Sequence, residues 1–318
     1  MNNNSNLISI IIPTYKGEKS IELLCNEILY KFKSYNVELI LINDNSPDNT
    51  HQICLDLIKT HSNSNITYIK LGKNFGEHNA VLAGLKNCSG DLALIMDDDF
   101  QNPTNEAIKL LDYSLKNNFD VVYGNYIEKK HSLIRNIISK VNNISANIIL
   151  EKPKNLYLSS FKTIKRKIID QITLYSGPYP YIDGLILSAT SNISSLNVRH
   201  EERGIEYGKS GYNILKLFKL YSNLIGNFST KPIHICSITG VFITILSVLF
   251  AIYLIIDKIV NPNITPGYSS IVILIIFFSG IQLIFIGLIG EYVGKILKNV
   301  NNSKAYYIEL IKRTKDPT

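Results

Sequence analysis

The stretch GDLALIMDDDFQNP, residues 90–103, decides the fold class. Its apolar run, residues 92–96, is typical of a strand buried on both faces of a parallel sheet. Three aspartates, Asp97 to Asp99, follow at once, and Pro103 suits the first turn of a helix. Open α/β sheets bind ligands at the carboxyl ends of their strands, so we expect the acidic run to lie in a binding site.

The flanking sequence alternates between apolar strands and helix-like segments. Strands are expected at residues 7–13, 37–43, 66–71, 92–96 and 120–124, and helices at 20–32, 50–60, 76–87 and 103–116. This alternation predicts an α/β fold, in which helices cover both faces of a mostly parallel, Rossmann-like sheet. The strand-end rule places Thr14, Tyr15 and Asp44 on the edge that carries the aspartates. The chain has neither the dinucleotide-binding glycine pattern nor a P-loop, which argues against dehydrogenases and P-loop enzymes.

Two uncharged stretches explain the composition of the chain. Of 318 residues 46% are hydrophobic and only 19% charged, whereas soluble domains carry about 25% charge. Residues 235–256 and 269–290 contain no charged side chain, and each exceeds the roughly 20 residues that cross a bilayer as a helix. They predict a transmembrane hairpin, because the connection between them is short and holds two prolines. The alternative is a pair of buried helices in a soluble domain.

Charge around the hairpin predicts its orientation. The net charge is +7; basic residues precede and follow the hairpin, and its connection holds only Lys258. By the positive-inside rule both termini face the cytoplasm, and the protein is a multi-pass protein of the bacterial inner membrane. We expect a catalytic domain at 1–198, interfacial helices at 199–234 and a basic cytoplasmic tail at 291–318. The segment 213–225 has helical apolar spacing, which fits either an interfacial helix or core packing.

The acidic run predicts a metal site. Side chains two apart on an extended chain point the same way, so Asp97 and Asp99 are expected to lie together. Their mutual repulsion would raise their pKa values, and a divalent cation relieves it. Carboxylate oxygens suit Mg²⁺ or Mn²⁺, and two carboxylates with a substrate diphosphate match the preference of Mg²⁺. Read alone, the same residues could be an acidic turn that caps the next helix.

Several ordered stretches make the chain similar to a known family. They are SIIIPTYKGEKSI, ELILINDNSPDNT, LGKNFGEHNAVLAGL, GDLALIMDDDFQNP, DVVYG, HEERGIEYGKSGY and GIQLIFIGLIGEYVGKI. Together they resemble glycosyltransferase family 2, and within it the membrane-anchored polyprenyl-phosphate glycosyltransferases. That group includes dolichyl-phosphate mannose synthase, the bactoprenol glucosyltransferases and the aminoarabinose transferase of lipid A modification. The resemblance covers nearly the whole chain and implies a GT-A fold, a nucleotide-sugar donor and a divalent metal.

The resemblance also implies roles on the donor side. Asp44 would accept the base N–H, as uracil would offer it, and Asp99 would be the main metal ligand beside Asp97. The family usually has an acid where Asn43 stands. The nucleotide-sugar contacts implied by the family pattern are Pro13, Thr14, Tyr15, Asp44, Asp97, Asp98 and Gln101.

The acceptor side is expected to be basic. Residues 129–167 hold ten Lys or Arg and one acid, which predicts a surface for lipid headgroups and a lipid phosphate. A solvated basic face is the alternative. The resemblance places Arg135, Ser139 and Arg203 at the acceptor phosphate, with Arg203 also near the donor. The arginine that the family often has after the Y-G of DVVYG is absent.

These roles describe an inverting transfer to polyprenyl (undecaprenyl) phosphate, with Asp99, Arg203 and Asp97 as catalytic residues. A phosphate is already ionised at neutral pH, so no strong base is needed. Asp183 is the candidate base if the acceptor is a hydroxyl of a lipid-linked saccharide. A non-catalytic membrane module that binds a nucleotide sugar is a further alternative. We expect no nucleic-acid partner and, from the family, a homo-oligomer such as a tetramer.

Overall fold

The structure is a computed structural model that describes residues 6–126, 156–201, 267–300 and 304–314, with separate positions between 238 and 260. The chain divides into two compact units. One comprises Met1–Asn213 with Asn302–Thr318, and the other comprises Ile214–Asn301. The expected interfacial segment 199–234 lies mostly outside the described residues, as does 213–225.

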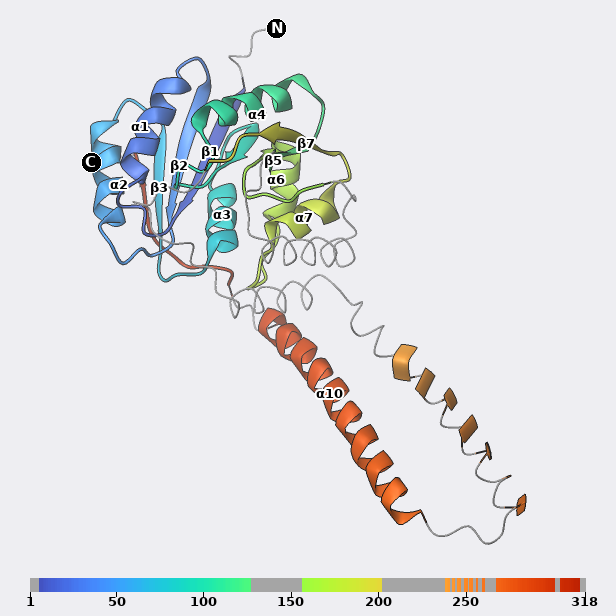
Figure 1. The fold of residues 1–318 in the computed structure, drawn as a ribbon. Coiled ribbons are helices and arrows are strands. Elements are labelled where there is room, and N and C mark those ends of the chain that lie inside the picture. Colours follow the sequence, from blue (N-terminus) through green and yellow to red (C-terminus); the bar gives the residue numbers. More distant parts are fainter. Residues whose placement is uncertain are drawn as a thin grey trace. The chain divides into compact units, whose positions relative to one another are not determined.

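The first unit contains one eight-stranded sheet in the order β7-β5-β6-β4-β1-β2-β3-β8 (Figure 1). Six strands run parallel, and β6 and β8 run antiparallel to their neighbours. The strands are β1 (Leu7–Thr14), β2 (Asn36–Asn43), β3 (Ile66–Leu71), β4 (Leu92–Ile95), β5 (Val121–Tyr126), β6 (Lys162–Lys165), β7 (Ile193–Val198) and β8 (Ile308–Arg313). The mostly parallel α/β sheet predicted from the sequence is confirmed.

Helices cover both faces of this sheet. Those of the first unit are α1 (Ile21–Lys31), α2 (Thr50–Thr60), α3 (Glu77–Lys86), α4 (Thr104–Lys116), α6 (Arg166–Ile172) and α7 (Ile182–Ala189). Helices α1, α2 and α4 pack in one apolar cluster, and α3, α6 and α7 pack in the other. Strand β1 explains why the strands are apolar throughout: Ile10 and Ile12 belong to the first cluster, and Ile11 to the second.

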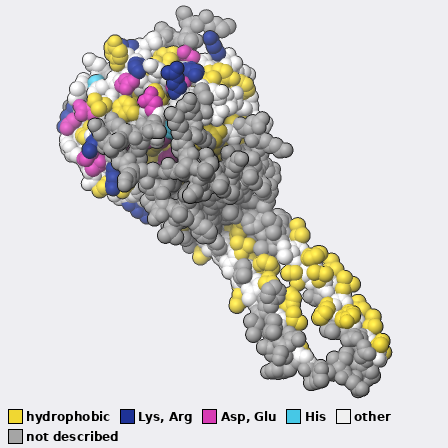
Figure 2. Space-filling model, in the orientation of Figure 1, with side chains coloured by type: hydrophobic (Ala, Val, Ile, Leu, Met, Phe, Trp, Pro, Cys, Tyr) yellow, Lys and Arg dark blue, Asp and Glu magenta, His cyan; other side chains and the backbone are white. Residues whose placement is uncertain are grey.

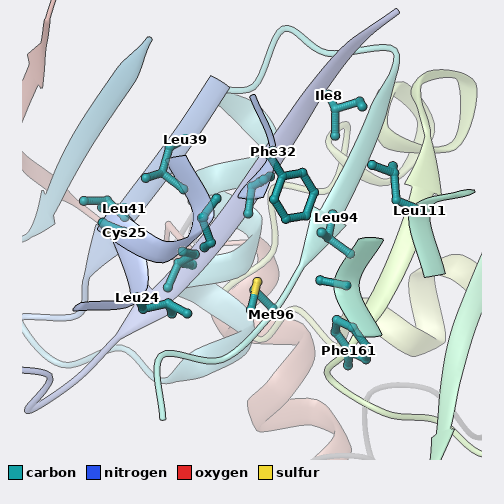
Figure 3. Packing of buried hydrophobic residues seen from close by; sticks show 14 of the residues in the cluster. Ile8, Leu24, Cys25, Phe32, Leu39, Leu41, Leu94, Met96, Leu111 and Phe161 are labelled. Atoms are coloured by element: carbon teal, nitrogen blue, oxygen red, sulfur yellow. The ribbon is translucent and has the colours of Figure 1, made fainter. Parts of the chain in front are cut away.

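The cluster beneath α1, α2 and α4 is continuous across the sheet. Figure 3 shows Phe32, which directly follows α1, among side chains from the strands, with Leu94 and Met96 on the β4 side. Phe32 is fully buried, and burying a side chain of this size stabilises the fold by about 1.5–3 kcal/mol. Met96 belongs to this cluster and directly precedes the acidic run, so core packing fixes where the aspartates leave the sheet.

The C-terminal residues hold a strand that the charge pattern did not predict. Within the range expected as a basic tail, β8 pairs antiparallel with β3, and Lys70 pairs with Glu309 at 2.8 Å. Thr314 Oγ1 donates to the carbonyl of Ser64 at 2.7 Å. Residues 304–314 are therefore part of the sheet domain, in addition to the predicted range 1–198.

The second unit contains α10 (Tyr268–Val300), which includes the expected span 269–290. Several of its apolar side chains are exposed, and Figure 2 shows hydrophobic side chains gathered along this helix. Among the residues described in the structure, no helix satisfies both the length and the apolarity needed to cross a bilayer. Much of the other expected span, 235–256, lies outside the described residues.

Candidate active site

Three parallel neighbours, β4, β1 and β2, bring the predicted residues to one edge. In the β1–β2 register Thr14 lies opposite Asn43, and the N–H of Asp44 donates to the carbonyl of Thr14 at 3.0 Å. Strand β4 ends at Ile95, two residues before Asp97. The sequence-based prediction that these side chains share the carboxyl edge of the sheet is confirmed.

The loop after β1 packs directly on the acidic run. Thr14 Oγ1 donates a hydrogen bond to Asp98 Oδ2. A Cβ atom on Gly17 would collide with both of these groups, so only glycine fits there. Pro13 is buried, whereas Tyr15 is 44% exposed. Asp98 therefore holds the β1–α1 loop, in which the ring of Tyr15 is exposed and open to a ligand.

Asp44 fixes the loop between β3 and α3. Its two carboxylate oxygens accept the N–H groups of Phe75, at 2.8 Å, and Gly76, at 2.7 Å. Burial raises the pKa of Asp44, and these two hydrogen bonds oppose that rise. Each oxygen keeps a lone pair for a further donor. Asn43 is structural: its amide donates to the hydroxyl of Tyr68 at 3.0 Å.

The pair Asp97 and Asp99 concentrates negative charge. Burial, the nearby Glu77 and Asp99 raise the pKa of Asp97 to about 7, against a hydrogen bond at 2.6 Å from Ser160. Asp99 is 9% exposed and accepts the N–H of Gln101 at 3.2 Å. Two crowded carboxylates at a strand end are suited to a divalent cation.

The donor set limits what kind of metal site this is. Across the described ranges, no group of three or more His, Cys, Asp or Glu side chains is arranged to hold an ion. Asp97 and Asp99 do not fit a site built from protein side chains alone. They fit a site in which two carboxylates hold the ion and a bound diphosphate supplies further oxygens.

The segment at 200–201 closes one side of the acidic turn. Glu201 N–H donates to the carbonyl of Gln101 at 3.0 Å, and the Gln101 side chain reaches the Glu201 carbonyl at 3.5 Å. The ring of His200 stacks on Tyr126 with 4.0 Å between centroids. The predicted acceptor residues Arg135, Ser139 and Arg203 lie outside the described residues.

Asp183, the candidate base, is engaged in a buried ion pair. It is 6% exposed, and Lys162, which is 3% exposed, pairs with its Oδ1. The hydroxyl of Tyr123 donates to the same oxygen at 2.9 Å. The sequence does not predict Lys162 as a site residue, because Lys162 belongs to the basic stretch 129–167 that is expected at the surface.

The described end of that basic stretch does not form one acceptor surface. Lys165 bonds Asn118 at 2.9 Å, and Lys167 pairs with Asp120 at 2.7 Å. The guanidinium of Arg166 donates to the carbonyl of Gly90. These partners precede β4 and β5, at the edge of the sheet opposite the aspartates. For Lys165, Arg166 and Lys167 the predicted acceptor-facing surface is therefore wrong, because the antiparallel β6 carries the chain to the other edge before these residues.

The fold and the acidic strand ends define an α/β protein with a candidate ligand site at the carboxyl edge of its sheet. Residues 9–173, just over half of the chain, match the model of glycosyl transferase family 2. The chain belongs to this family, and it is a glycosyltransferase.

Relatives extend the likeness over almost the whole chain. An undecaprenyl-phosphate 4-deoxy-4-formamido-L-arabinose transferase of Proteus mirabilis is 29% identical over 98% of this chain and 96% of its own. CsbB of Bacillus subtilis, named as a glycosyltransferase, is 29% identical over 95% of this chain and 91% of its own. Glucosyl-3-phosphoglycerate synthase of Mycobacterium tuberculosis, crystallised with Mn²⁺, UDP-glucose and phosphoglyceric acid, has a similar fold. The TM-score is 0.52 at 16% identity, over 70% of this chain and 78% of that one.

Proposed function

We propose that this glycosyltransferase moves a sugar from a nucleotide-sugar donor to a polyprenyl phosphate, with inversion at the anomeric carbon. The observation that carries the proposal is the convergence of Thr14, Asp44, Asp97 and Asp99 on one sheet edge. The relative from Proteus mirabilis, whose name specifies undecaprenyl phosphate, spans the same length of chain and supports the acceptor class.

The donor site is formed by the loops after β1, β2 and β4. Tyr15 is exposed beside them and offers a ring on which a base can stack. Asp44 retains acceptor capacity for a base N–H, which favours uracil and hence a UDP-sugar. Asp97, Asp98 and Gln101 line the sugar-phosphate side.

Asp97 and Asp99 would hold Mg²⁺ or Mn²⁺, which when bound offsets the charge on the diphosphate leaving group. Other residues of the chain position these ligands and bind the phosphates. Glu201 and Gln101 hold the turn that positions Asp99. Arg203, two residues after Glu201 in the sequence, is proposed to pair with the donor and acceptor phosphates, for which guanidinium is suited.

An ionised lipid phosphate is the proposed nucleophile. One of its oxygens forms the bond to the anomeric carbon while the bond to the nucleoside diphosphate breaks, so no proton has to be removed. The engagement of Asp183 with Lys162 supports this base-free scheme over transfer to a hydroxyl. Arg135 and Ser139 are proposed as acceptor-phosphate contacts.

The proposed location is the cytoplasmic face of the bacterial inner membrane. Support comes from the sequence of the two uncharged stretches and from exposed apolar side chains on α10, such as Ile275 and Leu283. The stretches would form a two-helix hairpin with both termini in the cytoplasm. A homo-oligomer, such as a tetramer, would cover part of the apolar helix surface.

A donor screen tests the proposal. Purified full-length protein is incubated with Mn²⁺, undecaprenyl phosphate and a panel of UDP- and other nucleotide sugars, and the lipid is analysed by mass spectrometry. One donor should give a lipid heavier by one sugar residue, and Asp99→Ala should not. Nucleotide release without a glycosylated lipid for every donor would contradict the proposed acceptor.

A further inference from the structure

A buried cation lies at the acidic edge of the sheet and has no role in the proposed chemistry. Lys162 is almost completely buried, pairs with Asp183, and lies with its ammonium 4.9 Å from the centre of the Tyr123 ring. Burying a charged pair costs solvation free energy. A hydrophobic pair of similar size would serve packing alone equally well, so another role for this cation is worth testing.

The strand register places Lys162 beside the metal-binding aspartates. Lys162 lies opposite Ile95 in the antiparallel β4–β6 pair. Ser160 lies two residues before Lys162, and Asp97 lies two residues after Ile95. The hydrogen bond from Ser160 to Asp97 therefore joins the next positions in the same register. Side chains two residues apart share a face of the sheet, so Lys162 and Asp97 are diagonal neighbours on one face. Burial raises the pKa values of Asp97 and Glu77, and the positive charge of Lys162 opposes that rise.

From this geometry we propose that Lys162 is a fixed counter-charge beside the donor pocket, and that the balance between its charge and that of Asp183 sets the affinity of the pocket for the divalent ion. Lys162 moderates the negative charge on Asp97 and Asp99, and Asp183 holds the ammonium in place. Asp183 is then a positioning residue and not a base. This inference rests on the proposed metal-dependent function.

Mn²⁺ binding to the full-length protein in detergent tests the inference without any turnover. The fraction of free Mn²⁺ is followed by electron paramagnetic resonance. Lys162→Met should bind Mn²⁺ at least about fivefold more tightly, and Asp183→Asn at least about fivefold more weakly, because unscreened charges act strongly in a buried site. The double variant, in which the pair is neutral, should return to within about threefold of wild type.

Two controls separate charge from structure. Lys162→Arg keeps the cation and should keep the wild-type affinity. Lys165→Met removes a lysine at the other end of the same strand, bonded to Asn118, and should also keep it. Should Lys162→Met fail to fold, the nearly isosteric Asp183→Asn and the neutral double variant still give the comparison.

Equal Mn²⁺ affinity in wild type, Asp183→Asn and the double variant would overturn the proposed role of Lys162. It would leave the proposed metal site itself unaffected. An Asp183→Asn protein that binds Mn²⁺ like wild type but transfers no sugar would overturn it in favour of a base. A wild type that binds no Mn²⁺ would instead overturn the proposed metal site.

Discussion

The carboxylate of Asp44 accepts the backbone N–H of Gly76 over 2.7 Å, across 32 positions of the chain. With the second bond, to Phe75, it joins the end of β2 to the loop that begins α3. The loop takes a backbone shape that needs glycine, since Gly76 has φ 94°. One buried carboxylate therefore lies at the proposed nucleotide site and also fixes the neighbouring loop.

We expect Asp44→Ala to lower the free energy of unfolding by about 2 kcal/mol, because two N–H groups lose their acceptor. It should also raise KM for the donor. Thermal unfolding by circular dichroism and initial rates measure the two effects. Asp56→Ala, at an exposed position of α2, is the control and should change stability by less than about 0.5 kcal/mol. A fully stable Asp44→Ala would show that the loop does not depend on this residue.

The contact of α3 with the sheet is close at Gly84. A Cβ atom there would lie 2.6 Å from Ile11 Cγ2 and 2.8 Å from Ile42 Cδ1. Gly84→Ala should lower stability by about 1 kcal/mol, since overpacking costs about 1–3 kcal/mol and better helix propensity offsets about 1. Ile42→Val removes one of the clashing atoms, so the double variant should lose less than the sum of the single losses. Strictly additive losses would refute the contact.

Strand β8 should be necessary for the stability of the sheet domain. Ending the chain after residue 303 exposes the hydrogen-bonding edge of β3 and removes buried Ala305. The unfolding midpoint of the domain should fall by at least about 5 °C. Glu309→Gln, which removes only the ion pair with Lys70, should cost less than about 1 kcal/mol. An unchanged midpoint in the truncated protein would mean that β8 is dispensable.

His78 should make stability dependent on pH. Burial lowers its pKa from 6.5 to about 4, with Lys162 acting in the same direction and Asp183 against it. As pH falls below 6.5 the unfolded chain takes up the proton first, so this contribution to stability is complete above 6.5 and lost toward pH 4. His78→Gln, neutral at every pH, should therefore lose less thermal stability than wild type between pH 7 and pH 5. Identical losses in the two proteins would contradict this account.

The sequence predicts the parallel strands β1 to β5, because their buried parts are mostly apolar, but it misses the parallel strand β7, which reads ISSLNV. The antiparallel strands escape prediction for a physical reason. Strand β6 reads KTIK and β8 reads IELIKR, so their polar residues look like loop or tail. Both become strands because β4 and β3 offer unpaired edges, and pairing across long stretches of chain leaves no local pattern.

The candidate site also has a part that the sequence predicts and a part that it does not. The position of Asp97, Asp99 and Asp44 at one edge follows from the strand-end rule, which is local. The partners of Asp183 do not follow, because Lys162 and Tyr123 come from different strands and meet only through the β5–β6 pairing. The only sequence signal at Lys162 is its charge, and a charged residue is expected to lie at the protein surface.

The central claim is that an ionised lipid phosphate accepts the sugar, and phosphorus NMR of the lipid product tests it most directly. Product made from undecaprenyl phosphate by the wild-type protein should show a phosphodiester signal in place of the monoester, and Asp99→Ala should leave the monoester unchanged. If undecaprenyl phosphate stays a monoester while a lipid-linked saccharide gains the sugar with its phosphorus signal unchanged, a hydroxyl is the acceptor and the proposal is contradicted.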